Sequence, residues 1–116
     1  MMIPLEIELL WWDGCPSTER ALDELHEALR DVGLGDVPVR RREIRTDSEA
    51  EAAGFVGSPT ILIGGEDVAP FGTDEEPGLA CRVYRRRDGR ISPTPDPDDV
   101  RETLRRVLAR TAEDDQ

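Results

Sequence analysis

The pattern of apolar and polar residues predicts a strand followed by a helix in the first third of the chain. Residues 5–12 form an apolar run that is typical of a central strand covered on both faces. Apolar residues then recur with the helical period between residues 16 and 32, and Gly33 follows as a stop signal. Pro16 suits the first helical position, where its missing N–H costs no hydrogen bond. The pattern therefore places Cys15 at the start of a helix.

Further strands and a short helix follow in the middle of the chain. Residues 37–44 begin with alternating apolar and polar residues, which predicts a strand with one exposed face near a sheet edge. Strand, helix and strand at this spacing predict a βαβ unit with parallel strands. Residues 46–53 predict a short helix that Gly54 ends, with Thr46 and Glu49, or Ser48 and Glu51, as its alternative caps. Residues 60–63 predict a buried strand, and the glycine pair after it predicts a hairpin with a return strand over residues 66–69.

The last third combines loops with one clear helix. Residues 71–78 are rich in glycine, proline and acidic side chains, which predicts a loop. Residues 79–84 fit an extended segment and a helical turn almost equally well. In the extended case Asp88-Gly89 makes a hairpin turn, with residues 90–91 as the return strand. Asp96 is the predicted cap of a final helix.

Length and charge limit the classes of function. We expect residues 1–111 to form one domain, followed by an acidic tail over residues 112–116. The formal net charge of −11 argues against nucleic-acid binding, which needs a basic face. No apolar run approaches the ~18 residues of a membrane helix and no secretory leader is visible, so we expect a cytoplasmic protein without a membrane partner. All 15 basic residues are arginine, and the clusters 40–42 and 85–87 are interpreted as solvated faces, with anion recognition as the alternative.

Two cysteines carry the candidate chemistry. The dipole and free N–H groups of a helix start favour a thiolate, so Cys15 is the expected nucleophile; the alternative is a small buried apolar residue. Cys81 is either a second thiol that resolves a mixed disulfide or a core residue. Asp13 either makes a turn with Gly14 or donates a proton near the thiol. Two cysteines are too few for a closed zinc site and His26 has no partner spacing, so we expect no metal.

The order of elements resembles the thioredoxin superfamily, with Cys15-Pro16 after the first strand and Gly57-Ser58-Pro59-Thr60 before the third. With Cys81-Arg82-Val83-Tyr84 added, the motifs are similar to those of small bacterial thioredoxin-like proteins, some of them labelled alkylmercury lyase-like. The resemblance extends from Leu5 to Ala109. It implies an α/β fold, thioredoxin-like, of order βαβ-α-ββ-α with a central mixed sheet flanked by helices.

The resemblance also implies a ligand groove beside the first cysteine. In that superfamily a cis-proline faces the motif cysteine, so Pro59 is expected opposite Cys15. The backbone at Ser58 is then expected to hydrogen-bond an extended peptide or a thiol ligand. The same resemblance and the neighbouring positions add three groove residues, namely Trp12, Pro16 and Thr60.

One departure from the superfamily pattern concerns the second thiol. A dithiol oxidoreductase has Cys-x-x-Cys, whereas Thr18 occupies the second of those positions in this chain. A lone cysteine attacks a disulfide but needs another thiol to be released, either Cys81 or a small-molecule thiol. The Thr18 hydroxyl is expected to hydrogen-bond the Cys15 thiolate.

Three functions are compatible with these residues. The first is a thioredoxin-like thiol redox protein, which is a thiol-disulfide oxidoreductase if it turns over. Its expected partner is a thiol-containing small molecule or a protein disulfide, and we expect no cofactor. The second is an alkylmercury lyase-like or soft-metal-binding protein that uses Cys15 and Cys81 together, with Asp13 as proton donor. The third is a non-catalytic binding module whose thiol is incidental.

Overall fold

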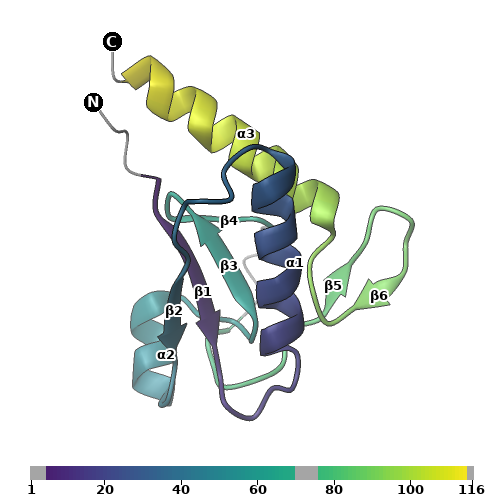
Figure 1. Cartoon of the computed structure of the whole chain (residues 1–116). Coiled ribbons are helices and arrows are strands. Elements are labelled where there is room, and N and C mark those ends of the chain that lie inside the picture. Colours follow the sequence, from purple (N-terminus) through teal and green to yellow (C-terminus); the bar gives the residue numbers. More distant parts are fainter. Residues whose placement is uncertain (1–4, 70–75, 115–116) are drawn as a thin grey trace.

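The chain folds as a mixed α/β protein with a four-stranded sheet and three helices (Figure 1). The computed structural model describes residues 5–69 and 76–114. The elements in chain order are β1 (Ile7–Trp11), α1 (Thr18–Asp31), β2 (Arg40–Glu43), α2 (Asp47–Ala53), β3 (Thr60–Ile63), β4 (Glu66–Asp67), β5 (Tyr84–Arg85), β6 (Ile91–Ser92) and α3 (Pro97–Asp114).

The sheet has the strand order β2-β1-β3-β4. β1 pairs with β2 in parallel and with β3 in antiparallel orientation, and β3 pairs with β4 as a hairpin. The predicted parallel βαβ unit and the edge position of its second strand are therefore confirmed. The central position of β1 agrees with its apolar sequence, because a strand between two neighbours is covered on both faces.

Each face of the sheet has its own apolar cluster. Ile7 and Leu9 of β1 point to the face that α1 and α3 cover, where residues such as Leu25 and Leu104 complete the larger cluster. Leu10 points to the opposite face, where it packs with Phe55 and residues of α2. Successive residues of a strand point to opposite faces, so β1 holds both layers of helices in place. Within the described ranges, no helix is long and apolar enough to cross a bilayer.

The start of α1 differs from the prediction. The helix begins at Thr18, and the Ser17 carbonyl accepts its first hydrogen bond from the Ala21 N–H at 3.0 Å. Pro16 is therefore not the first helical residue, because the Cys15 N–H closes a turn onto the Trp12 carbonyl at 3.0 Å. The prediction for Pro16 was wrong by two residues, and Cys15 lies in the turn that leads into the helix.

The short helix α2 begins and ends where the sequence indicates. The Thr46 hydroxyl accepts a hydrogen bond from the Glu49 N–H at 3.0 Å, which is the expected N-terminal cap. Gly54 ends the helix in the left-handed conformation, with φ of 66°. Most of the loop predicted over residues 71–78 lies outside the described residues, and residues 76–78 are neither helix nor strand.

Residues 79–85 are extended, which decides between the two alternatives left open by the sequence. Cys81 forms an isolated parallel bridge with Ser58, and β5 then pairs with β6 in a hairpin. The return strand covers Ile91–Ser92, one residue later than predicted. Figure 1 shows this hairpin beside α1, away from the four-stranded sheet.

Arginines of the 85–87 cluster connect the hairpin to both long helices. Arg86 forms an ion pair with Glu24 of α1 at 3.6 Å. Arg87 forms ion pairs with Asp99 at 2.7 Å and Glu102 at 2.6 Å, both on α3. The 40–42 arginines are exposed on the edge strand β2, as a solvated face would be.

Asp96 connects the start of α3 to the hairpin. Its Oδ1 accepts a hydrogen bond from the Asp98 N–H at 2.9 Å, and its Oδ2 accepts one from the Arg87 N–H at 2.9 Å. The bond from Arg87 is the main cause of a lowered pKa for Asp96, against an opposing effect of partial burial. The predicted cap is confirmed, and α3 continues to Asp114, into the segment expected to be a tail.

We expect Asp96→Ala to lower the free energy of unfolding by about 1–2 kcal/mol, because both amide bonds are lost. The pKa of Asp96 is lowered in the folded state, so its contribution is present at neutral pH and is lost as the pH falls. Urea denaturation at pH 7 and near pH 3 measures both effects. Asp36→Ala, in the exposed loop before β2, is the control and should change stability by less than about 0.5 kcal/mol. An equal loss at both pH values would contradict this role.

Candidate functional site

The two cysteines, far apart in sequence, face one another in the fold. Cys15 lies in the turn after β1, and Cys81 lies in the extended segment that precedes β5. The two thiols lie close enough for Cys15 to raise the pKa of the Cys81 thiol. Both thiols are free, and they differ in accessibility: Cys15 is 7 % exposed, whereas Cys81 is exposed.

Ser58 places the two cysteine segments against each other. Its N–H donates to the Ala80 carbonyl and its carbonyl accepts from the Arg82 N–H, both at 2.8 Å. The same carbonyl accepts a hydrogen bond from the Cys15 thiol at 3.3 Å, and the Ser58 hydroxyl accepts one from the Trp12 N–H at 3.0 Å. The main-chain groups expected to bind an external ligand are thus bonded to the protein's own residues 80–82.

Gly57 allows this close approach of two backbones. A Cβ atom at Gly57 would lie 2.8 Å from the Arg82 Cβ and 3.0 Å from the Arg82 N and Cα. Contacts this short with backbone atoms force one of the two segments to move. The glycine before Ser58 is therefore required for residues 80–82 to occupy their position.

The Arg82 side chain fixes the same segment from inside the protein. Its guanidinium forms an ion pair with Asp67 at 2.7 Å, and the two side chains are only 8 % and 13 % exposed. It also donates to the Thr60 hydroxyl at 3.3 Å and to the Ala69 carbonyl, and lies over the Tyr84 ring at 4.6 Å. Because a buried guanidinium needs these partners, the position of Arg82 is tightly determined.

The predicted groove residues of the Pro59 turn are interior. The Ser58–Pro59 peptide bond is cis, and Pro59 is fully buried. Its carbonyl accepts a hydrogen bond from the Tyr84 hydroxyl, and burial raises the pKa of Tyr84, so this hydroxyl keeps its proton. The Thr60 hydroxyl donates to the Gly57 carbonyl at 2.6 Å. Pro59 and Thr60 therefore support residues 80–85 instead of lining an open groove.

The surroundings of Cys81 raise the pKa of its thiol. A hydrogen bond with Cys15 is the largest cause of a raised pKa for Cys81, followed by partial desolvation and by the charge of the neighbouring sulfur. Cys81 therefore keeps its proton at neutral pH. The Cys15 thiol donates a hydrogen bond to the Ser58 carbonyl.

The Thr18 hydroxyl does not make the hydrogen bond expected of it. Thr18 is buried, and its Oγ1 has no hydrogen-bond partner among the described residues. A buried hydroxyl without a partner costs folding free energy. In the first turn of α1, close in sequence to Cys15, such a group remains free to donate to a sulfur anion.

We expect Thr18→Val to raise the free energy of unfolding by about 1 kcal/mol, because valine fills the same space without an unpaired hydroxyl. Thr103→Val is the matched control, since the buried Thr103 hydroxyl donates to the Asp99 carbonyl at 2.8 Å. That control should leave stability unchanged or lower it. Thermal and urea denaturation of both variants decide the point, and a destabilised Thr18→Val variant would show that the hydroxyl has a partner.

The remaining predicted residues lie around the turn that carries Cys15. Asp13 and Pro16 are exposed. Trp12 is half-buried against the smaller apolar cluster, and a Cβ at Gly14 would lie 2.5 Å from its ring. Among the described residues Asp13 has no hydrogen bond to either thiol, so its expected role as proton donor has no support in this geometry.

Three residues of the site received no role from the sequence, namely Asp67 and the two motif residues Arg82 and Tyr84. The available signal was the alternation in residues 81–84: if the segment is extended, Arg82 and Tyr84 share one face and Cys81 and Val83 the other. A charged residue on an inward face requires a buried partner, and Asp67 on the return strand β4 is that partner.

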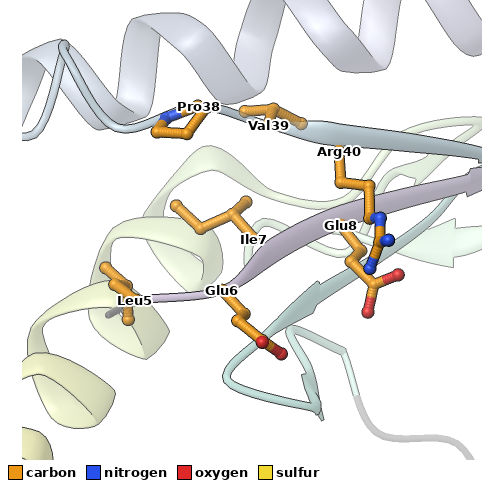
Figure 2. Close-up of a pocket in the computed structure, with 7 residues that line it drawn as sticks. All are labelled: Leu5, Glu6, Ile7, Glu8, Pro38, Val39 and Arg40. Atoms are coloured by element: carbon orange, nitrogen blue, oxygen red, sulfur yellow. The ribbon is translucent and has the colours of Figure 1, made fainter. Parts of the chain in front are cut away.

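A separate cavity lies at the other end of β1, away from Cys15. Its volume is about 240 Å³, and Figure 2 shows Glu8 and Arg40 pointing toward one another at its side. None of the lining residues carries a thiol or a hydroxyl; they are Leu5, Glu6, Ile7, Glu8, Pro38, Val39 and Arg40. Within the described ranges, no group of three or more His, Cys, Asp or Glu side chains is placed to hold a metal ion.

The geometry therefore identifies one candidate site, a pair of facing thiols held by Ser58 and by the buried Arg82–Asp67 ion pair. Compared with known protein families, with curated proteins and with solved structures, the chain matches none of them.

Proposed function

We propose that this chain is a thioredoxin-like thiol redox protein in which Cys15 and Cys81 form one dithiol–disulfide couple. The observation that carries the proposal is that two cysteines 66 positions apart in sequence meet at Ser58, whose carbonyl accepts a hydrogen bond from the Cys15 thiol and whose main chain forms a bridge with Cys81. A second thiol beside the first supplies the group that the missing Cys-x-x-Cys motif would otherwise provide.

Three features support the thioredoxin-like assignment. The sheet is mixed, with β1 in its interior and the first helix directly after the strand and turn that carry Cys15. The cis peptide bond joins Ser58 to Pro59, and the Ser58 carbonyl accepts a hydrogen bond from the Cys15 thiol. These are the positions that the sequence motifs assign to the superfamily's cysteine and cis-proline.

The proposed reaction transfers two electrons between this couple and an external disulfide. Oxidation joins the Cys15 and Cys81 sulfurs and releases two protons, while the external disulfide takes up both electrons and both protons and becomes two thiols. Each exchange step passes through a mixed disulfide between one protein sulfur and one external sulfur. The unpaired hydroxyl of Thr18 is the candidate donor to the Cys15 sulfur while that atom carries negative charge.

A redox titration tests the proposal. The protein is equilibrated with mixtures of reduced and oxidised dithiothreitol, and free thiols are then alkylated in acid-quenched denaturant and counted by mass. We expect a single two-electron transition, in which the ratio of oxidised to reduced protein changes tenfold for about 30 mV of potential. Both thiols should disappear together. Cys15→Ser and Cys81→Ser should each show no such transition. Two thiols that stay free at every ratio would contradict the proposed function.

The same pair of thiols supports a second function, the binding of a soft metal ion. Thiolates select soft ions, and with two sulfurs and no third ligand among the described side chains the site suits a two-coordinate ion such as Hg²⁺. We expect one Hg²⁺ per chain to protect both cysteines from alkylation, and either single serine variant to lose this protection. Binding that survives Cys81→Ser would show that the two sulfurs do not act together.

A further inference from the structure

The two sulfurs of the proposed couple are unequally accessible to a molecule in solution. Cys15 is 7 % exposed, and its thiol donates to the Ser58 carbonyl; Ala80 and Arg82, on both sides of Cys81, are hydrogen-bonded to the same Ser58 main chain. Cys81 itself is exposed. Of the two thiols that meet at Ser58, one is therefore inside the protein and the other faces solvent.

The extended conformation of residues 81–84 gives this segment an inner and an outer face. Arg82 and Tyr84 point inward and are buried, whereas Val83 is 67 % exposed on the same face as Cys81. A molecule that approaches the couple from solvent thus meets the Cys81 sulfur first, beside an exposed aliphatic side chain.

The segment of residues 80–82 is firmly held beside Cys15. If it moved away, both main-chain hydrogen bonds to Ser58 would break, and the Arg82 guanidinium would have to leave Asp67, Thr60 and Ala69. Separating a buried ion pair without replacing its partners is strongly unfavourable. The segment is therefore part of the folded protein and does not act as a loosely held cover.

From this arrangement we infer that an external sulfur atom becomes bonded to Cys81, and that the buried Cys15 is the thiol that leaves or resolves. The inference rests on the proposed function and assigns the two roles within it. The expected roles are thereby exchanged, because the helix-start position had indicated Cys15 as the residue that meets the substrate.

The exchange step follows from the positions of the three sulfurs. A thiolate R–S⁻ attacks the Cys81 sulfur of the protein disulfide, in line with the bond to the buried Cys15 sulfur. The bond between R–S and Cys81 forms, the bond between the two protein sulfurs breaks, and its electron pair stays on Cys15. Cys15 then takes a proton and re-forms its hydrogen bond to the Ser58 carbonyl.

A second external thiolate completes the reaction. It attacks the R sulfur of the mixed disulfide, so that R–S–S–R forms and Cys81 leaves with the electron pair and takes a proton. The protein disulfide has then gained two electrons and two protons, which two external thiols have lost.

Mapping the mixed disulfide in the wild-type protein tests the inference. The oxidised protein is mixed with 2-mercaptoethanol, quenched in acid at increasing times and digested at low pH, and the adducts on the two cysteine peptides are compared by mass. When the amounts of adduct are extrapolated to zero time, we expect at least tenfold more on Cys81 than on Cys15. Equal amounts, or more adduct on Cys15, would overturn the inference and leave the redox couple intact.

Two variants provide an independent kinetic comparison. Reduced Cys15→Ser and Cys81→Ser are reacted with hydroxyethyl disulfide, first folded and then in guanidinium chloride. We expect the remaining Cys81 to react at least tenfold faster than the remaining Cys15 in the folded variants, and the two rates to converge in denaturant. A folded Cys15 that reacts as fast as Cys81 would overturn the inference. If the wild-type protein forms no disulfide at all, the proposed function fails, and the inference fails with it.

Discussion

Arg82→Met is expected to lower the free energy of unfolding by about 3–5 kcal/mol, because it leaves the Asp67 carboxylate buried without its partner. The two side chains are 8 % and 13 % exposed, so water replaces little of the lost interaction. Urea denaturation measures the change. The same variant should form the proposed Cys15–Cys81 disulfide more slowly, since Arg82 fixes the segment that carries Cys81.

Two controls separate the buried charge from the loss of packing. Arg85→Met changes an exposed arginine of the next strand and should shift stability by less than about 0.5 kcal/mol. Arg82→Met combined with Asp67→Leu removes both charges and should recover most of the stability lost by Arg82→Met alone. If Arg82→Met costs no more than Arg85→Met, the ion pair does not stabilise the position of residues 80–82.

Gly57→Ala is expected to separate the two thiols while leaving the sheet and the helices in place. The added methyl group lies within 3.0 Å of Arg82 main-chain atoms, so residues 80–82 must move away from Ser58. Overpacking of this kind costs about 1–3 kcal/mol. If about 1.4 kcal/mol of that cost falls on the bridge between Ser58 and Cys81, disulfide formation slows roughly tenfold.

Gly78→Ala is the matched control, because a Cβ at Gly78 meets nothing within 4 Å. The rate of thiol loss in a fixed dithiothreitol redox buffer should fall in Gly57→Ala and stay at the wild-type value in Gly78→Ala. Far-ultraviolet circular dichroism should be the same for all three proteins. A wild-type rate in Gly57→Ala would show that the close approach at this glycine does not determine the distance between the thiols.

Most of the architecture could be predicted because it depends on local patterns. The apolar run of β1 and the helical period of α1 are each contained within one short window, and both elements were predicted correctly. The caps at Thr46 and Asp96 were predicted from single polar residues before helical segments. These signals need no knowledge of what the rest of the chain does.

The site depends on contacts that local patterns do not contain. Ser58 and Cys81 are 23 positions apart and meet in an isolated bridge outside the named strands, so no hydrophobic period relates them. The sequence identified both cysteines and the Pro59 turn, and it could not show that residues 80–82 pair with Ser58 beside Cys15. The true start of α1 was likewise missed, because the turn closed by Cys15 and Trp12 delays the helix beyond Pro16.

The contact between the two sulfurs is tested most directly by oxidising the fully reduced protein with one equivalent of diamide and measuring its intact mass and its peptides. The account predicts a monomer lighter by two hydrogen atoms, with the peptides that contain Cys15 and Cys81 joined by a disulfide. Two unchanged thiols, or a disulfide-linked dimer in place of the monomer, would contradict it.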